Sequence, residues 1–81
     1  MKAEIFTSPT CIKCKSLKTQ LENENYDNLT IDFIDITTPD GMEKAKEKGV
    51  TGLPTACLYD DDGSEMGHAH DIDEIEEILG Q

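Results

Sequence analysis

Two cysteines near the start of the chain have the spacing of a redox pair or of half a metal site. They lie in the segment Cys11-Ile12-Lys13-Cys14. A thiolate attacks disulfides and also binds metal ions. The Cys-x-x-Cys spacing occurs in both redox pairs and zinc sites. The chain has three cysteines in total, and an odd number argues against a framework of structural disulfides. We therefore expect thiol chemistry or metal binding at this segment.

The two cysteines are expected to differ in role, because Cys11 stands at the start of a predicted helix and Cys14 one turn inside it. The free N–H groups and partial positive charge of a helix N-terminus stabilise an anion. Cys11 is therefore the predicted nucleophile, and Cys14 the thiol that resolves the mixed disulfide. Lys13 and Lys15 add positive charge, which should lower the pKa of Cys11 further.

Metal binding is the alternative for the same pair. Zinc needs four ligands, and Cys57 with His68 or His70 could complete the set. Structural zinc sites usually use two local ligand pairs, however, and the sequence has no second Cys-x-x-Cys. We therefore favour redox chemistry and expect no metal, with zinc or an iron–sulfur cluster as the alternative. Cys57 is then expected to be a buried structural thiol.

Hydrophobic periodicity predicts the elements that position these residues. Cys14, Leu17 and Leu21 recur at helical spacing, whereas β-branched residues between 29 and 36 are typical of a strand. Thr38 and Asp71 are candidate helix caps. The predicted strands are 2–6, 29–36, 55–59 and 64–68, and the predicted helices run from 11 to about 23–25, from 39 to 49 and over 72–79.

The order of these elements, β-α-β-α-β-β-α, predicts an α/β fold. The first β-α-β unit gives two parallel strands joined by a right-handed crossover. The turn Asp60-Asp61-Asp62-Gly63 predicts an antiparallel hairpin. We expect a four-stranded mixed sheet with three helices covering its two faces. A chain of 81 residues is expected to form one domain, 1–81.

The charge of the chain limits its partners. The net charge is −11, with seven lysines and no arginine. Nucleic acids and anionic membranes attract basic surfaces, so neither is an expected partner. Three of the lysines, Lys13, Lys15 and Lys18, lie around the cysteine pair. The chain opens without a signal-peptide pattern and has no membrane-length apolar run, so we expect a cytoplasmic protein.

Three segments together resemble the thioredoxin and glutaredoxin superfamily: FTSPTCIKC (6–14), DFIDI (32–36) and GVTGLPT (49–55). The resemblance implies the minimal thioredoxin fold and a dithiol oxidoreductase that reduces protein disulfides through the Cys11–Cys14 pair, which forms a redox-active disulfide when oxidised. It also implies that Pro54 is cis and packs beside the cysteine pair. The backbone of Leu53 would pair with an extended substrate segment. Ile12 and Lys13, between the cysteines, are also expected to contact substrate.

Within the superfamily, the chain is similar to small glutaredoxin-like redoxins and to short archaeal or phage thioredoxins. It lacks the tryptophan that precedes Cys11 in typical thioredoxins and the Pro-Tyr between the cysteines of typical glutaredoxins. The implied partners are a reductase of the thioredoxin-reductase type or glutathione, and a disulfide-containing client such as ribonucleotide reductase. A monomer without a cofactor is expected. His68 and His70 are expected to be polar surface residues, unless one of them senses the Cys11 thiolate.

Overall fold

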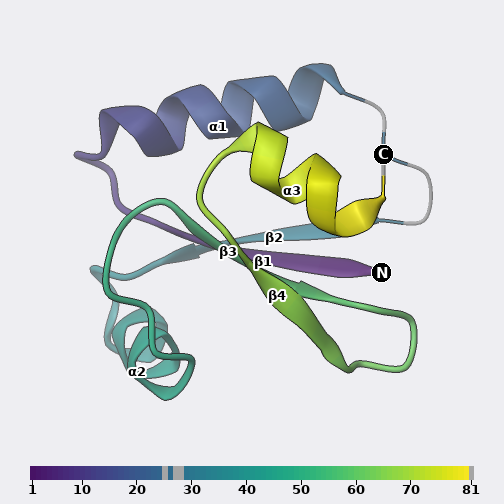
Figure 1. The fold of residues 1–81 in the computed structure, drawn as a ribbon. Coiled ribbons are helices and arrows are strands. Elements are labelled where there is room, and N and C mark those ends of the chain that lie inside the picture. The colour runs from purple at the N-terminus through teal and green to yellow at the C-terminus, as the bar shows by residue number, and fades with distance from the viewer. Residues whose placement is uncertain (25, 27–28, 81) are drawn as a thin grey trace.

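The computed structural model describes residues 1–24, 26 and 29–80, which form four strands and three helices (Figure 1). The elements are β1 (Lys2–Thr7), α1 (Ile12–Asn23), β2 (Thr30–Asp35), α2 (Pro39–Glu47), β3 (Thr55–Tyr59), β4 (Glu65–Ala69) and α3 (Ile72–Leu79). The predicted order is confirmed, with ends that differ from the prediction by one or two residues. Asn25, in the predicted end of the first helix, lies outside the described residues.

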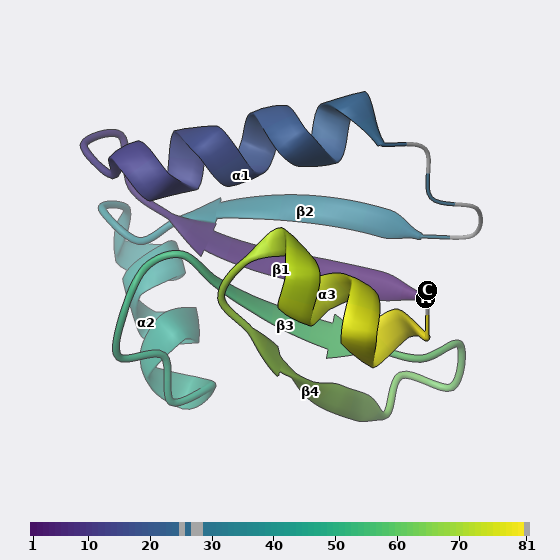
Figure 2. The same cartoon turned by 45° about the horizontal axis from the view of Figure 1, so that its top comes forward.

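The strands form one mixed sheet in the order β2-β1-β3-β4. β1 runs parallel to β2, and β3 runs antiparallel to both β1 and β4. Figures 1 and 2 show α1 and α3 over one face of the sheet and α2 on the other. The predicted four-stranded α/β architecture, with helices on both faces, is therefore confirmed.

The face under α1 and α3 carries the larger part of the core. Successive side chains of a strand point to opposite faces, so Ala3 and Ile5 of β1 share this side. They pack in one buried cluster with Leu17 and Leu21 of α1 and Ile75 of α3. The apolar stripe predicted on the first helix thus holds α1 on the sheet, which fixes the position of the cysteine pair at its start.

The face under α2 has a smaller core and a buried acid. Phe6, Ala45 and Cys57 form the buried cluster on this side. Glu4, one alternation from Phe6, is only 4% exposed. Its Oε2 accepts a hydrogen bond from Lys44 Nζ at 2.5 Å and lies 3.7 Å from Lys2 Nζ. Two cations therefore compensate a carboxylate that the sheet removes from water.

α2 begins against the end of β2 because a glycine lets the chain approach closely. Thr38 is the predicted cap, and its Oγ1 accepts the N–H of Gly41 at 3.0 Å. A Cβ at Gly41 would lie 2.0 Å from the carbonyl oxygen of Asp35. Any larger residue would push α2 away from the end of β2.

Strand β4 contains a bulge opposite the end of β3. Cys57 pairs with His68 and Leu58 with Gly67, but Tyr59 pairs with Glu65, so one residue of β4 is extra. Gly67, beside the extra residue, has a φ of 151°, in the region that favours glycine. The bulge changes the side of the sheet to which residues before Gly67 point.

We predict that the Glu4 ion pairs make stability depend on pH. Burial raises the pKa of Glu4, but the hydrogen bond and charge of Lys44, with the charge of Lys2, outweigh this effect and hold the pKa below its ordinary value. A lowered folded-state pKa stabilises the fold above the unfolded-state pKa, and this contribution disappears as pH falls through the folded-state pKa. Glu4→Gln should therefore destabilise the protein at pH 7 by about 1 kcal/mol, since Lys44 is partly exposed.

The difference between Glu4→Gln and the wild type should shrink as pH falls from about 5 to about 3. Urea unfolding at several pH values measures it. Glu43→Gln, which removes an exposed acid on α2, is the matched control and should change stability little at any of these pH values. Parallel pH profiles for Glu4→Gln and the wild type would contradict the prediction.

Candidate active site

Cys11 is the N-cap of α1, as predicted. β1 ends at Thr7, and the chain turns so that the Cys11 N–H donates to the Ser8 carbonyl at 3.2 Å. The backbone of Cys11 is extended, with φ −85° and ψ 110°. Its side chain therefore points back over the first turn, where helical N–H groups have no helical partner.

The sulfur of Cys11 occupies the position that a serine or aspartate oxygen takes in ordinary caps. Cys11 Sγ accepts the backbone N–H of Cys14 at 3.1 Å. The structure joins Cys11 and Cys14 as a disulfide, with their Cα atoms 5.2 Å apart. When this bond is reduced, the same N–H and the helix dipole favour a negative charge on Cys11.

The two sulfurs differ in accessibility. Cys11 is half-buried, whereas Cys14 is 3% exposed, beneath the start of α1. Cys11 is therefore the more exposed residue of the two, which is the asymmetry on which the expected roles of attacking and resolving thiol depend.

The loop that carries Leu53 and Pro54 lies at the same edge of the sheet as the cysteine pair. Thr55, directly after Pro54, pairs with Phe6 of β1. β1 ends one residue after Phe6, at Thr7, and the loop to α1 begins there. The Leu53–Pro54 peptide is cis, which confirms the prediction from the resemblance. Thr55 Oγ1 donates to the Gly52 carbonyl at 2.6 Å and ties the loop to the start of β3.

A shallow groove of about 210 Å³ runs beside Cys14. It is bounded by residues of β1, the following loop, α1 and β2, namely Thr7, Ser8, Pro9, Cys14, Lys15, Lys18, Phe33 and Asp35. Sequence reasoning placed Lys15 and Lys18 near the cysteines but missed the contribution of β2. The parallel pairing of β1 with β2 was the available signal, because it puts residues 33–35 beside residues 5–7.

The groove contains charges of both signs. Lys18 Nζ lies 5.3 Å from the centre of the Phe33 ring. Thr37 donates to Asp35 Oδ1 from its hydroxyl at 2.6 Å and from its backbone N–H at 2.8 Å. These hydrogen bonds hold the pKa of Asp35 below its ordinary value.

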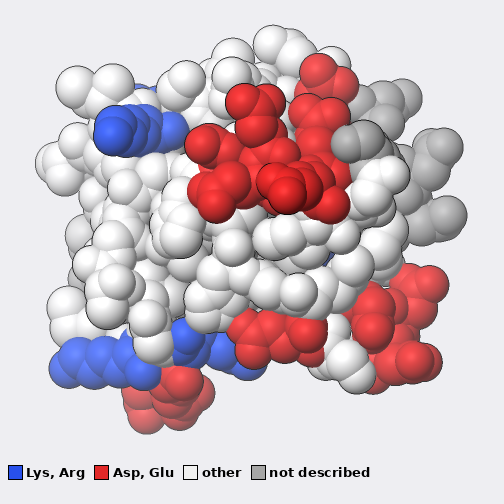
Figure 3. Space-filling view, viewed as in Figure 1, with Lys and Arg blue, Asp and Glu red and all other residues white. Residues whose placement is uncertain are grey.

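The charges are unevenly spread over the surface. Figure 3 shows basic side chains over the end of α1 that carries the cysteines and over α2, whereas acidic side chains gather over α3. Ile12, between the cysteines, is 82% exposed.

The predicted metal set does not assemble around the cysteine pair. Within residues 1–24, 26 and 29–80, the grouping of three or more possible ligand side chains is Cys57, Glu65 and His68, without Cys11 or Cys14. His68 lies on β4 opposite Cys57, and its Nε2 contacts Glu65. His70 Nδ1 lies 3.4 Å from a Glu74 carboxylate oxygen.

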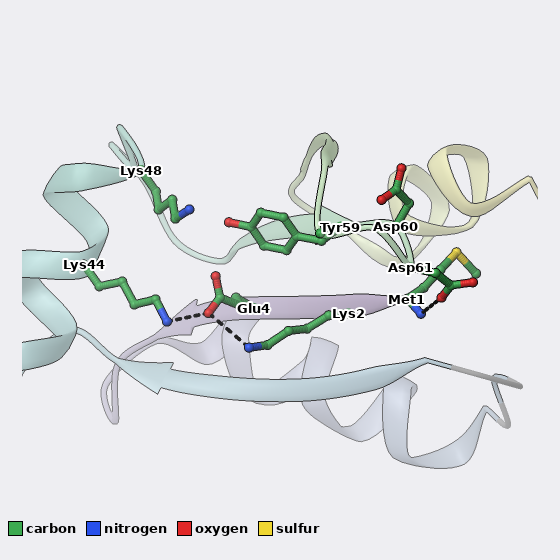
Figure 4. Close-up of a pocket in the computed structure, with 9 residues that line it drawn as sticks. Met1, Lys2, Glu4, Lys44, Lys48, Tyr59, Asp60 and Asp61 are labelled. Atoms are coloured by element: carbon green, nitrogen blue, oxygen red, sulfur yellow. Dashed lines mark hydrogen bonds and ion pairs between the residues drawn. The ribbon is translucent and has the colours of Figure 1, made fainter.

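A second cavity, of about 520 Å³, lies on the α2 side of the sheet. Figure 4 shows its lining, in which Lys44 and Lys2 reach toward Glu4 and Lys48 reaches toward Tyr59. The lysines Lys2 and Lys44 balance the negative charge of Glu4 within it. Neither Cys11 nor Cys14 lines this cavity. This cavity is therefore separate from the cysteine pair.

Cys57 behaves as predicted for a structural thiol. It is fully buried in the core under α2. Burial raises its pKa, and the negative charges of Glu65 and Glu4 raise it further against the opposing charge of Lys48. The thiol therefore stays protonated at neutral pH, where thiolate chemistry is slow.

The sequence is similar to that of known thioredoxins. A family model described as a thioredoxin-like domain matches residues 2–81. A thioredoxin of Methanocaldococcus jannaschii is 33% identical over 64 residues, which cover 75% of this chain and 73% of that protein.

Solved structures share the fold. Thioredoxin 1 of Thermosipho africanus superposes with a TM-score of 0.81 at 24% identity, covering 99% of this chain and 91% of the other. A thioredoxin from Thermus thermophilus superposes with a TM-score of 0.71 at 21% identity, covering 98% of this chain and 71% of the other.

Among the helices that the structure describes, none combines the length and apolar character needed to cross a bilayer.

We predict that Cys11 reacts first when the reduced protein meets an alkylating agent at pH 7. Cys11 has a helix terminus and an accessible sulfur, whereas Cys14 and Cys57 are buried. Brief iodoacetamide treatment followed by peptide mass spectrometry should label Cys11 at least about tenfold faster than Cys57, the ratio for one pKa unit. In denaturant the rates should become similar. Labelling of Cys57 first would show that the burial and helix-terminus argument is wrong.

Proposed function

Because the chain belongs to the thioredoxin-like family, we propose that it is a small dithiol carrier that reduces protein disulfides through Cys11 and Cys14. The observation that carries the proposal is the position of Cys11. Its sulfur caps α1, accepts the Cys14 N–H at 3.1 Å and is the more accessible of the two. These properties suit an attacking thiolate beside a protected resolving thiol.

The reaction has two balanced steps. The Cys11 thiolate attacks one sulfur of a client disulfide; a bond forms between the two proteins, and the other client sulfur leaves as a thiolate and takes a proton. Cys14 then loses its proton and attacks Cys11 Sγ. The second client sulfur leaves, and the Cys11–Cys14 disulfide remains. Two electrons pass from the carrier to the client.

Four residues at the same edge are the proposed substrate contacts. Ile12 and Lys13 flank the reacting sulfur on an exposed turn of α1. Leu53 offers backbone groups before the cis bond to Pro54, so that an extended client segment can pair there. A client would thus be held by backbone hydrogen bonds with its disulfide presented to Cys11.

The proposed partners follow from the charge of this edge. Lys13, Lys15 and Lys18 offer an acidic reductase or client a positively charged binding site beside Cys11, on a protein whose net charge is −11. Similarity to thioredoxins favours a reductase of the thioredoxin-reductase type over glutathione as the electron source. Ribonucleotide reductase is a candidate client. The proposed carrier is a cytoplasmic monomer of one domain that needs no cofactor, because the reduced Cys11–Cys14 dithiol itself carries the electron pair.

We predict that removing the resolving thiol traps the client. Cys14→Ser keeps the Cys11 nucleophile but cannot complete the second step, so a mixed disulfide should accumulate. The variant is mixed with a protein disulfide such as that of insulin, and non-reducing electrophoresis and mass spectrometry detect the adduct. Dithiothreitol should release it.

Two matched variants control the trapping experiment. Cys11→Ser should give at least about tenfold less adduct, because Cys14 is buried. The double variant Cys11→Ser/Cys14→Ser retains only Cys57 and should give none. Equal trapping by Cys14→Ser and Cys11→Ser, or an adduct in the double variant, would refute the assigned roles.

A further inference from the structure

A second group of reactive side chains lies on the α2 face of the sheet, apart from the redox pair. Cys57 of β3 and Glu65 and His68 of β4 each present one sulfur, oxygen or nitrogen, and these three atoms all lie within 4.8 Å of one another. Cys57 is buried, whereas the side chains of His68 and Glu65 are 34% and 46% exposed. The proposed redox function makes no use of any of them.

The strand register brings two of these residues together. Cys57 and His68 are direct cross-strand partners in the antiparallel pair β3–β4. Side chains of directly opposed residues point to the same face of a sheet and lie close together. The imidazole of His68 therefore lies beside the sulfur of Cys57.

The bulge in β4 supplies the third residue. In an unbroken strand, Met66 would share a face with His68, and Glu65 would point to the opposite face. The extra residue shifts the register so that Glu65, and not Met66, stands opposite Tyr59, on the face that also holds Cys57. The bulge next to Gly67 thus turns a carboxylate toward a thiol and an imidazole.

The geometry points to a metal site: we propose that Cys57, Glu65 and His68 bind a divalent transition metal ion of the zinc class. Thiolate sulfur, imidazole nitrogen and carboxylate oxygen are the three donor types that zinc takes in proteins. In tetrahedral coordination such donors stand about 3.5 Å apart. Donors within 4.8 Å of one another need only small side-chain rotations to reach this spacing.

Charge balance supports a divalent ion. Binding releases one proton from Cys57, and the resulting thiolate and the Glu65 carboxylate together neutralise two positive charges, while His68 binds as the neutral imidazole. Glu4 stands opposite Cys57 on β1 and adds negative charge. Lys48, whose Nζ lies 5.0 Å from the centre of the Tyr59 ring, opposes the ion from α2. Water completes the coordination sphere as a fourth ligand.

The ion has a route to the site. β4 is an edge strand of the sheet, so nothing pairs with its outer side among the residues that the structure describes. The partly exposed Glu65 and His68 lie between solvent and the buried sulfur. Their present contact with each other is replaced by contact with the metal, since a carboxylate oxygen and Nε2 are both donors to zinc.

The redox pair offers a direct way to isolate this site. Cys57 is the free thiol when Cys11 and Cys14 are joined as a disulfide. In the oxidised protein, therefore, thiolate coordination of a metal reports Cys57 alone. A failure of metal binding leaves the proposed function intact, and a failure of disulfide reduction leaves the metal site intact.

The test is a titration of the oxidised, untagged chain with Co²⁺, whose thiolate complexes give a near-ultraviolet charge-transfer band. We expect the band to saturate at one ion per chain and to disappear on addition of Zn²⁺, which binds such donor sets more tightly. Cys57→Ala should abolish the band. His68→Gln and Glu65→Gln, both at partly exposed positions that should tolerate the change, should weaken Co²⁺ binding at least about tenfold.

His70→Gln is the matched control. His70 is exposed and contacts Glu74, so its replacement should change Co²⁺ affinity by no more than about twofold. No thiolate band up to about 1 mM Co²⁺, the range of weak binding, would overturn the proposal and leave Glu65 and His68 as a surface contact between two polar side chains. A band that survives in His68→Gln and Glu65→Gln at unchanged affinity would overturn it as well.

Discussion

The first turn of α1 is the constraint on which the proposed chemistry depends. A helix begins with N–H groups that its own carbonyls cannot satisfy, and one of them points at the sulfur of Cys11. Moving Cys11 one residue along the chain would take its sulfur out of the cap position, where it accepts the Cys14 N–H. The activity therefore follows from where β1 stops and α1 starts, more than from the two cysteines alone.

The rest of the fold holds that turn in place. Leu17 and Leu21 anchor α1 to the sheet, and the pairing of Phe6 with Thr55 brings the Leu53–Pro54 loop to the same edge. The second face of the sheet has a different character. There Glu4 is compensated by lysines, and a bulge gathers a thiol, an imidazole and a carboxylate. One small sheet thus separates the Cys11–Cys14 pair, of which only Cys11 is partly exposed, from the buried thiol of Cys57.

The features that the sequence predicted well are local ones. Helical spacing of Cys14, Leu17 and Leu21, capping by Thr38 and Asp71, and the Asp-Gly turn each involve residues a few positions apart, and the structure confirms them. The cis bond before Pro54 was implied by the family resemblance and is present.

The features that it did not predict depend on long-range pairing. Glu4 and Lys44 are 40 positions apart, and the Cys57 group depends on a register shift that no turn residue specifies. The groove residue Phe33 comes from β2, which only the parallel pairing places beside the cysteines.

The most direct test of Cys11 and Cys14 as the redox pair measures how many client disulfides are opened for each carrier disulfide formed. The fully reduced chain is mixed with an excess of a protein disulfide, and both products are analysed by mass spectrometry after thiol trapping. We expect one client disulfide to be opened for each Cys11–Cys14 disulfide formed, with Cys57 still a free thiol. A client that stays oxidised, or an oxidised carrier with Cys57 in its disulfide, would contradict the assignment of the redox pair.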